Sequence, residues 1–507
     1  MGGEEYRLGS IEFISEDKVP VGTTLVAVPE PKRVTGAGTS PETVRLPKGG
    51  FDLIIMNPPF TRSVGGNLLF GSRPADERRE MQRRLSGLVG GGKVRADITA
   101  GLGSVFVAVA DRVLKRGGRQ ALVLPRAVLT GAAWAETRKL FAERYGVEYV
   151  VVSHDPQRWN FSENTDLSEV LLVARKEPDR DGTAETVWVN LTRNPRNITE
   201  ALALADAVLR ADPAPLSDSG VVRLKTDGEG WGEIFRVRWA DFRDGLWFPG
   251  SFARTALNRA ARHLIKEGRL LSKTVSMVRL GDLFELGPDR RDIHDGFTVS
   301  RDPTSYPALW GHGSGKVKTL ALRPNAYLVD RAAPAPGRHL RPAPRLWKRA
   351  GRLLIAERLR LNTHRLTAGW ADRPVLSNVW WPCRPRSQDI GPDEEKGLCI
   401  WLNSTPGLIV FLAHRTETQG AWVDFKKPTL ADMPVPDRDV LRSLAACFDR
   451  LRNRELQPLS RAAGDPVRAR IDRAVEAVLG LPQDALRGLR ELLAREPVLT
   501  LGKRNPR

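Results

Sequence analysis

Four consecutive residues, Asn57-Pro58-Pro59-Phe60, have the chemistry to hold a flat amine. They follow the apolar run 51–56 (FDLIIM), which predicts a buried strand ending at a stiff turn. Two prolines remove two backbone donors and fix φ at about −65°, so the carbonyls of the turn remain free to accept hydrogen bonds. The side-chain oxygen of Asn57 and the carbonyl of Pro58 can accept both N–H bonds of an exocyclic amino group. The ring of Phe60 can then pack against the plane that carries the amine.

A proline turn that only closes a strand is the alternative interpretation. The apolar run before the turn and the aromatic residue after it favour a chemical site. The segment resembles the catalytic motif of the amino-group methyltransferases, whose N6-adenine members carry Asn/Asp-Pro-Pro-aromatic after a buried strand. The resemblance implies a Rossmann-like sheet, S-adenosyl-L-methionine as methyl donor, and catalytic roles for Asn57, Pro58, Pro59 and Phe60.

The segments after this motif predict the alternating order of an α/β sheet. Helical spacing over 104–114 is followed by 115–118 (KRGG), which is typical of a helix end, and by the apolar strand 120–125. A second helix over 134–145 leads to a second strand over 147–153. This order predicts a largely parallel sheet with helices on both faces. The same order occurs in the methyltransferase family.

Aromatic residues before the next predicted strand, 167–176, are candidates for a wall of the base pocket. In the family, an aromatic before the final hairpin strand has this role, which implies Phe161 as the substrate-binding residue and Trp159 as the second candidate. An aromatic before a strand is more often a core residue. The assignment therefore depends on its position in an ordered series of matches.

The glycine-rich turn that binds S-adenosylmethionine has no match before Asn57. Such a turn follows the first strand of these sheets, because only glycine lets the backbone approach the cofactor closely. The segment 6–14 (YRLGSIEFI) resembles the family strand beside the cofactor adenine and implies that Ser10 and Ile11 contact the cofactor. We therefore expect a truncated enzyme, or a split one in which a second chain carries the cofactor-binding half.

The composition favours a polyanionic partner and argues against a disulfide-bonded, metal-binding or membrane protein. The net charge of +19 favours a polyanion such as double-stranded DNA, although an arginine-rich proteome is the alternative explanation. Three scattered cysteines and dispersed histidines predict neither a disulfide framework nor a metal site. No run of about 18 apolar residues exists and no signal segment begins the chain, so we expect a cytoplasmic protein without a membrane partner.

The second half of the sequence predicts a separate recognition domain. Tryptophans and arginines alternate over 235–249 and again near 380–381, which is compatible with a DNA-reading surface and equally with a core rich in tryptophan. The segment 278–286 (VRLGDLFEL) resembles the opening of target-recognition domains in restriction-modification systems. Residues 401–404 (WLNS) and 426–436 (KKPTLADMPVP) resemble the way those domains close.

The predicted organisation is an α/β protein in four parts: a partial Rossmann-like methyltransferase domain (1–176), a connector (177–278), a mixed α/β target-recognition domain (279–437) and a helical tail (438–507). Three tail helices, over 440–454, 465–479 and 482–494, are expected to pack together or to dock a partner.

The predicted function is site-specific transfer of methyl from S-adenosylmethionine to adenine N6 in DNA. The alternative from another class is a catalytically inert DNA-binding specificity protein of a restriction-modification or defence system. The same motif also serves RNA guanine and protein glutamine methylation, and a separate recognition domain of this size favours DNA.

Overall fold

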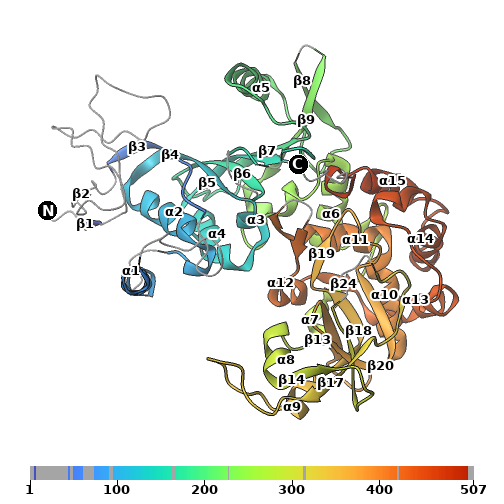
Figure 1. Ribbon diagram of the computed structural model, residues 1–507. Coiled ribbons are helices and arrows are strands. Elements are labelled where there is room, and N and C mark those ends of the chain that lie inside the picture. The colour runs from blue at the N-terminus through green and yellow to red at the C-terminus, as the bar shows by residue number, and fades with distance from the viewer. Residues whose placement is uncertain are drawn as a thin grey trace.

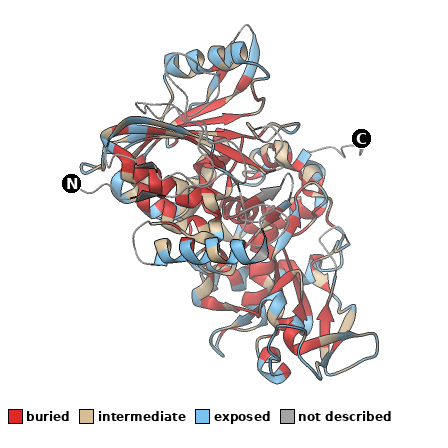
Figure 2. Cartoon of the chain, turned by 60° about the vertical axis from the view of Figure 1, so that its left-hand side comes forward, coloured by how far each residue is buried: buried red, intermediate tan, exposed pale blue. Residues whose placement is uncertain are grey.

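The computed structural model describes residues 5–6, 44–45, 50–60, 74–90, 95–158, 160–162, 167–226, 228–311, 316–419 and 422–500. Within this part the chain is a mixed α/β protein with two large mixed sheets, one in each half of the chain (Figure 1). Buried residues concentrate between the strands and the helices that pack on them (Figure 2).

The first sheet has seven strands in the order β3-β4-β6-β5-β7-β9-β8. The strands are β3 Phe51–Met56, β4 Leu114–Pro125, β5 Gly146–Ser153, β6 Glu169–Arg175, β7 Glu185–Leu191, β8 Val222–Thr226 and β9 Glu229–Arg238. β3 is parallel to β4 and β5 is parallel to β7, whereas β6 lies antiparallel between β4 and β5. The expected largely parallel sheet is therefore mixed, because the strand after β5 turns back and inserts beside it.

Strands from the segment expected to be a connector complete this sheet. β7 pairs with β5, and β9 and β8 follow in order. The helices of this half are α1 Ala75–Gly90, α2 Leu102–Val113, α3 Ala127–Thr130, α4 Ala135–Arg144 and α5 Ile198–Arg210, with short 3-10 turns at Ile98–Ala100 and Ala132–Trp134.

α2 and α4 confirm the two predicted helices and pack on one face of the sheet, around an apolar cluster that includes Val107, Leu122, Phe141, Val150 and Leu172. α5 packs on the opposite face, over β7, β8 and β9. That face stays open at the other end of the sheet, where Leu53 and Ile55 of β3 are 55% and 65% exposed.

The segment 115–118, predicted as a helix end, lies inside β4. The helix ends at Val113, because Leu114 already has extended backbone with ψ 134°. The N–H of Gly117 then donates to the carbonyl of Lys176 at 2.9 Å, so the chain passes from helix to sheet without a separate turn.

The second large sheet has the order β13-β21-β18-β20-β15-β17-β14, with β16 paired to β20. Its strands are β13 Phe284–Leu286, β14 Phe297–Ser300, β15 Tyr306–Leu309, β16 Ala321–Leu322, β17 Ala326–Asp330, β18 Gly351–Ala356, β20 Ala368–Ser377 and β21 Trp380–Pro385. Smaller sheets join β1 Glu5–Tyr6 to β2 Val44–Arg45, β10 Arg269–Leu270 to β11 Lys273–Thr274, β12 Met277–Arg279 to β24 Pro434–Pro436, and β23 Trp422–Asp424 to both β19 Arg358–Arg360 and β22 Thr416–Gln419.

Helices α6 to α16 surround and cover these strands. They are α6 Thr255–Glu267, α7 Leu280–Leu283, α8 Arg290–Gly296, α9 Ala343–Trp347, α10 Pro392–Asn403, α11 Thr405–Ala413, α12 Lys427–Ala431, α13 Arg438–Leu451, α14 Pro466–Leu479, α15 Arg487–Ala494 and α16 Pro497–Thr500, and further 3-10 turns lie at Trp239–Asp241, Phe248–Gly250 and Leu459–Gly464. In the described part of the chain no single helix is long and apolar enough to cross a membrane. Only α10 and α11 taken together, bent by 79° at their junction, meet the length and composition limits.

The tail helices and most of the tryptophans belong to the core. α13, α14 and α15 contribute Leu444, Ile471 and Leu493 to the same apolar cluster as β18 and α10. Trp239, Trp247, Trp380 and Trp381 are all at most 2% exposed. The alternation of tryptophan and arginine in the sequence therefore reflects core packing at these positions.

Candidate active site

The Asn-Pro-Pro-Phe segment lies where the sequence places it, directly after β3 and beside the parallel strand β4. Asn57 and Pro59 are exposed, Pro58 is buried and Phe60 is half-buried. A Cβ atom placed on Gly103 in the first turn of α2 would lie 4.0 Å from Cγ of Pro58. The first proline is thus packed against α2, while the asparagine before it faces solvent.

A residue that the sequence analysis did not single out contacts this segment. Nδ2 of Asn57 donates to Oγ of Ser162 at 3.0 Å, across a separation of 105 residues. The bond joins the turn after β3 to the loop between β5 and β6. It also leaves the carbonyl end of the Asn57 amide as the acceptor in this side chain.

A buried carboxylate holds that loop. Glu169, the first residue of β6, is 0% exposed, and its Oε2 accepts the backbone N–H of Phe161 at 2.7 Å and of Ser162 at 2.8 Å. Asn194 supports the base of the loop, since its Nδ2 donates to the carbonyls of Arg158 at 2.7 Å and Asn160 at 3.0 Å. An acidic residue at the start of an apolar strand was the available sequence signal for Glu169.

Of the other predicted site residues, Phe161 lies in the part of the chain that the structure describes. Phe161 is half-buried and packs against the apolar cluster of Val189 and Leu191. Trp159, Ser10 and Ile11 lie outside the described residues.

Ionic groups are buried beneath the ends of β4 and β5. Nη1 of Arg126 lies 2.9 Å from Oε2 of Glu417, and its Nη2 donates to the carbonyl of Gly250 at 2.9 Å. Arg415 lies 2.7 Å from the same glutamate. Burial lowers the pKa of Arg126 to about 10, and burial followed by the neighbouring Arg126 holds the pKa of His154 well below its usual range.

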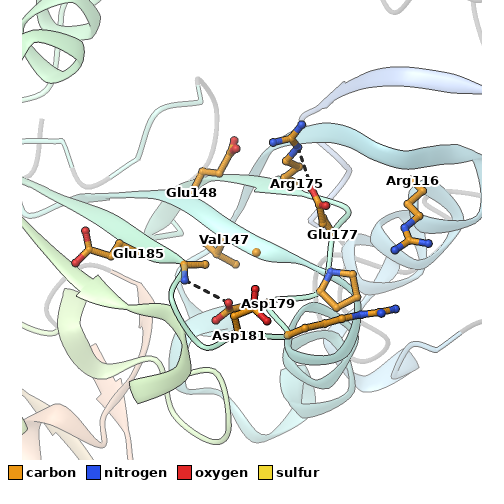
Figure 3. Close-up of a pocket in the computed structure, with 12 residues that line it drawn as sticks. Arg116, Val147, Glu148, Arg175, Glu177, Asp179, Asp181 and Glu185 are labelled. Carbon is orange, nitrogen blue, oxygen red and sulfur yellow. Dashed lines mark hydrogen bonds and ion pairs between the residues drawn. The ribbon is translucent and has the colours of Figure 1, made fainter.

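A separate pocket of about 430 Å³ opens at the other end of the first sheet (Figure 3). It is lined by charged side chains that include Arg116, Glu148, Arg175, Asp179 and Glu185. These residues lie near the amino ends of β4, β5 and β7 and the carboxyl end of β6. Because Asn57 follows the carboxyl end of a strand parallel to β4, the pocket is remote from the Asn-Pro-Pro-Phe segment.

In the described residues, no group of three or more His, Cys, Asp and Glu is placed to hold a metal ion. Cys383, Cys399 and Cys447 are free and buried, and burial raises the pKa of all three thiols.

No family model and no curated protein matches the chain. Among solved structures it is similar to the type IIG restriction endonuclease BpuSI, with 14% identity, a TM-score of 0.32, and coverage of 87% of this chain and 54% of that one. It is also similar to the type IIL restriction-modification enzyme MmeI in complex with DNA, with 11% identity, a TM-score of 0.39, and coverage of 87% and 56%. The HsdS subunit from Thermoanaerobacter tengcongensis matches at 13% identity and a TM-score of 0.23, over 73% of this chain and 97% of that one.

The chain thus spans about half the length of the first two of these structures. These similarities assign no function to the chain.

Proposed function

We propose that this chain is the base-binding and DNA-recognising part of a DNA methyltransferase that modifies adenine N6. One observation carries the proposal: Asn57-Pro58-Pro59-Phe60 ends a strand beside a parallel neighbour, and the amide of Asn57 is fixed by Ser162. The order of β3, β4, β6 and β5 supports a Rossmann-like catalytic sheet. A target adenine would be extruded from the duplex to reach this turn.

The chemistry assigned to these residues is orientation. Oδ1 of Asn57 and the carbonyl of Pro58 accept the two N–H bonds of the adenine amino group, and the ring of Phe60 packs on the base. This holds the nitrogen lone pair out of the ring plane, and most of the rate gain comes from that alignment. S-adenosylmethionine, when bound, supplies the methyl group.

The cofactor-binding half is proposed to come from a second chain or from sequence joined to this one. Ser10 and Ile11 are proposed to contact the cofactor but lie outside the described residues. Among the described strands, β3 is outermost in the first sheet, and its Leu53 and Ile55 remain exposed. The backbone edge of β3, unpaired among the described strands, fits further strands that would continue the sheet, and the exposed apolar face beside it fits an element that would cover it.

The recognition part is proposed to be the second half, with double-stranded DNA as its ligand. The segment 287–350, which includes β14, β17, α8 and α9, contains twelve Lys and Arg against five Asp and Glu. Arg301, Arg323 and Arg345 are among its exposed cations. Such a surface supplies phosphate contacts, which dominate nucleic-acid affinity.

Asn57→Ala tests the proposal in a host without adenine methylation, where N6-methyladenine in total DNA is quantified by mass spectrometry. The chain is expressed with its cofactor-binding half. The loss of an oriented acceptor should cost about 2–4 kcal/mol of transition-state stabilisation, while DNA affinity stays unchanged.

Asn453→Ala, at an exposed asparagine beyond α13, is the matched control and should retain wild-type methylation. Methylation by Asn57→Ala within about twofold of wild type would contradict the role of the turn. A wild-type chain that binds DNA specifically and never methylates would favour the specificity-protein alternative.

A further inference from the structure

The loop that contacts Asn57 is held by a carboxylate in an unusual environment. Glu169 is completely buried, and one of its oxygens, Oε2, accepts two consecutive backbone N–H groups, those of Phe161 and Ser162. Its other oxygen, Oε1, has no hydrogen-bond partner among the described residues. Burial of a carboxylate with an unsatisfied oxygen is costly, so a neutral residue would serve the fold alone better.

Two N–H donors on one oxygen fix the loop more tightly than a single bond does. Charge-assisted hydrogen bonds are shorter and roughly twice as strong as neutral ones. Because the two donors are adjacent, Glu169 sets both the position and the direction of the peptide between Phe161 and Ser162. The ring of Phe161 and the hydroxyl of Ser162 are placed by the same clamp.

The clamp is connected directly to the proposed active site. Ser162 accepts the Nδ2 proton of Asn57 at 3.0 Å, so its hydroxyl holds the amide in place with Oδ1 on the free side. Rotation of the amide by 180° would present NH₂ instead of oxygen to an incoming amine. The route from Glu169 to Asn57 therefore passes through one backbone N–H and one side-chain hydroxyl.

We propose that Glu169 is a positioning residue for amine binding: through the clamp on Ser162 it holds the Asn57 amide in place, with Oδ1 free to accept from the substrate amino group. The inference rests on the proposed function, and it adds Ser162 and Glu169 to the machinery of that site. Asn194 supports a different part of the loop, because it donates to the carbonyls of Arg158 and Asn160 at the base.

The first arm of the test does not require activity. In Glu169→Ala, hydrogen–deuterium exchange followed by mass spectrometry should show faster exchange in the peptide containing Phe161 and Ser162, by at least about tenfold. Glu169→Gln retains one carbonyl oxygen and should lie between Glu169→Ala and wild type. Unchanged exchange in Glu169→Ala would overturn the clamp.

The second arm is a double-variant cycle on methyl transfer, with the chain in the complete enzyme. Glu169→Ala should lower kcat by about 100-fold and Ser162→Ala by about tenfold, with DNA affinity unchanged, because misplacement of a binding group by about 1 Å has effects of this size. In the Asn57→Ala background, both substitutions should have little further effect. If each substitution lowered the kcat of Asn57→Ala by the same factor as it lowers that of wild type, the route through Asn57 would be wrong.

The chain contains a matched control. Glu496 is also a buried glutamate that accepts two consecutive backbone N–H groups, those of Ala253 at 2.9 Å and Arg254 at 3.2 Å, in the other half of the molecule. Glu496→Gln should alter stability and leave kcat unchanged. If Glu496→Gln and Glu169→Gln lowered kcat equally, Glu169 would be structural only and the inference would be wrong.

The two hypotheses fail separately. If the complete wild-type enzyme transfers no methyl group, the proposed function is wrong, and so is the proposed role of Glu169 in catalysis. The role of Glu169 is overturned if hydrogen–deuterium exchange is unchanged in Glu169→Ala, or if the losses in kcat multiply in the Asn57→Ala background. Either result leaves the assignment of Asn57 intact.

Discussion

At the scale of single residues, the molecule places several carboxylates where water cannot reach them and gives each a defined set of donors. Glu169 accepts two backbone N–H groups, Glu417 lies between Arg126 and Arg415, and Glu496 accepts two backbone N–H groups. For Glu496 burial is the larger influence and raises the pKa to about 7.

This shift predicts a pH dependence of stability. A carboxyl whose pKa is raised in the folded state stabilises the fold below its unfolded pKa of 4.5, and this contribution is lost as the pH rises through about 7. The free energy of unfolding of wild type minus that of Glu496→Gln should therefore fall by about 3 kcal/mol between pH 4.5 and pH 8. Denaturant unfolding at a series of pH values measures the difference. A difference that is constant or rises with pH would contradict the assignment.

At the scale of elements, β3 combines the candidate amine-binding turn at its carboxyl end with an exposed apolar face. Ile54 and Met56 pack against the core cluster of the first sheet, whereas Leu53 and Ile55 point to the open face. The strand is therefore anchored by alternate residues only. Apolar side chains exposed at this level on a sheet edge mark a contact surface or an aggregation hazard.

Ile55→Glu tests this surface. The side chain is already 65% exposed, so the substitution should change the free energy of unfolding by no more than about 0.5 kcal/mol. Ile55→Glu should abolish association with a co-expressed cofactor-binding half. The isolated wild-type chain should show no tight S-adenosylmethionine site in calorimetric titration. Leu209→Glu on α5, where the side chain is 72% exposed, is the control and should retain association. One tight cofactor site on the isolated chain would contradict the need for another half.

At the scale of the whole molecule, a buried ionic cluster joins the first large sheet to the segment that contains β22 in the second half of the chain. Arg126 follows β4 of the first sheet, while Arg415 and Glu417 come from the segment after α11. Oγ1 of Thr130 also donates to the carbonyl of Arg415 at 2.6 Å. The second half of the chain is thereby attached to the carboxyl end of β4, the neighbour of the strand that carries the candidate active site.

Glu417→Ala should destabilise the molecule by about 3–5 kcal/mol, because it leaves two buried guanidinium groups without their carboxylate. Glu148→Ala breaks the half-exposed pair with Arg119 and should cost no more than about 1 kcal/mol. Denaturant unfolding of the two variants under one condition gives the comparison. Equal losses would mean that the buried cluster does not hold the two halves together.

DNA binding should follow the charge of the segment 287–350. Replacement of Arg301, Arg323 and Arg345 by alanine should weaken binding to every duplex and make the dependence of log affinity on log salt shallower by about 0.9 for each phosphate that is no longer neutralised. Titration of labelled duplex between about 50 and 200 mM salt measures the slope. The same number of charges removed at Arg461, Arg470 and Arg495 in the tail should leave the slope unchanged.

The sequence by itself determined local elements and the position of one turn. Hydrophobic periodicity located α2, α4, β4, β5 and β6, and the Asn-Pro-Pro-Phe residues placed a stiff turn after a strand, for which amine binding is the proposed chemistry. These features depend on neighbours in the chain, since periodicity and proline geometry act over a few residues.

The tertiary structure decided the rest, because it depends on contacts between distant segments. Insertion of β6 between β4 and β5 made the sheet mixed, and burial turned the tryptophans into core residues. The Ser162 hydroxyl reaches Asn57 only because two segments 105 residues apart in sequence meet at the end of β3. Glu169 has its role only where chain folding brings its carboxylate to the N–H groups of that loop. No local pattern encodes such pairings, since each requires two segments to meet in space.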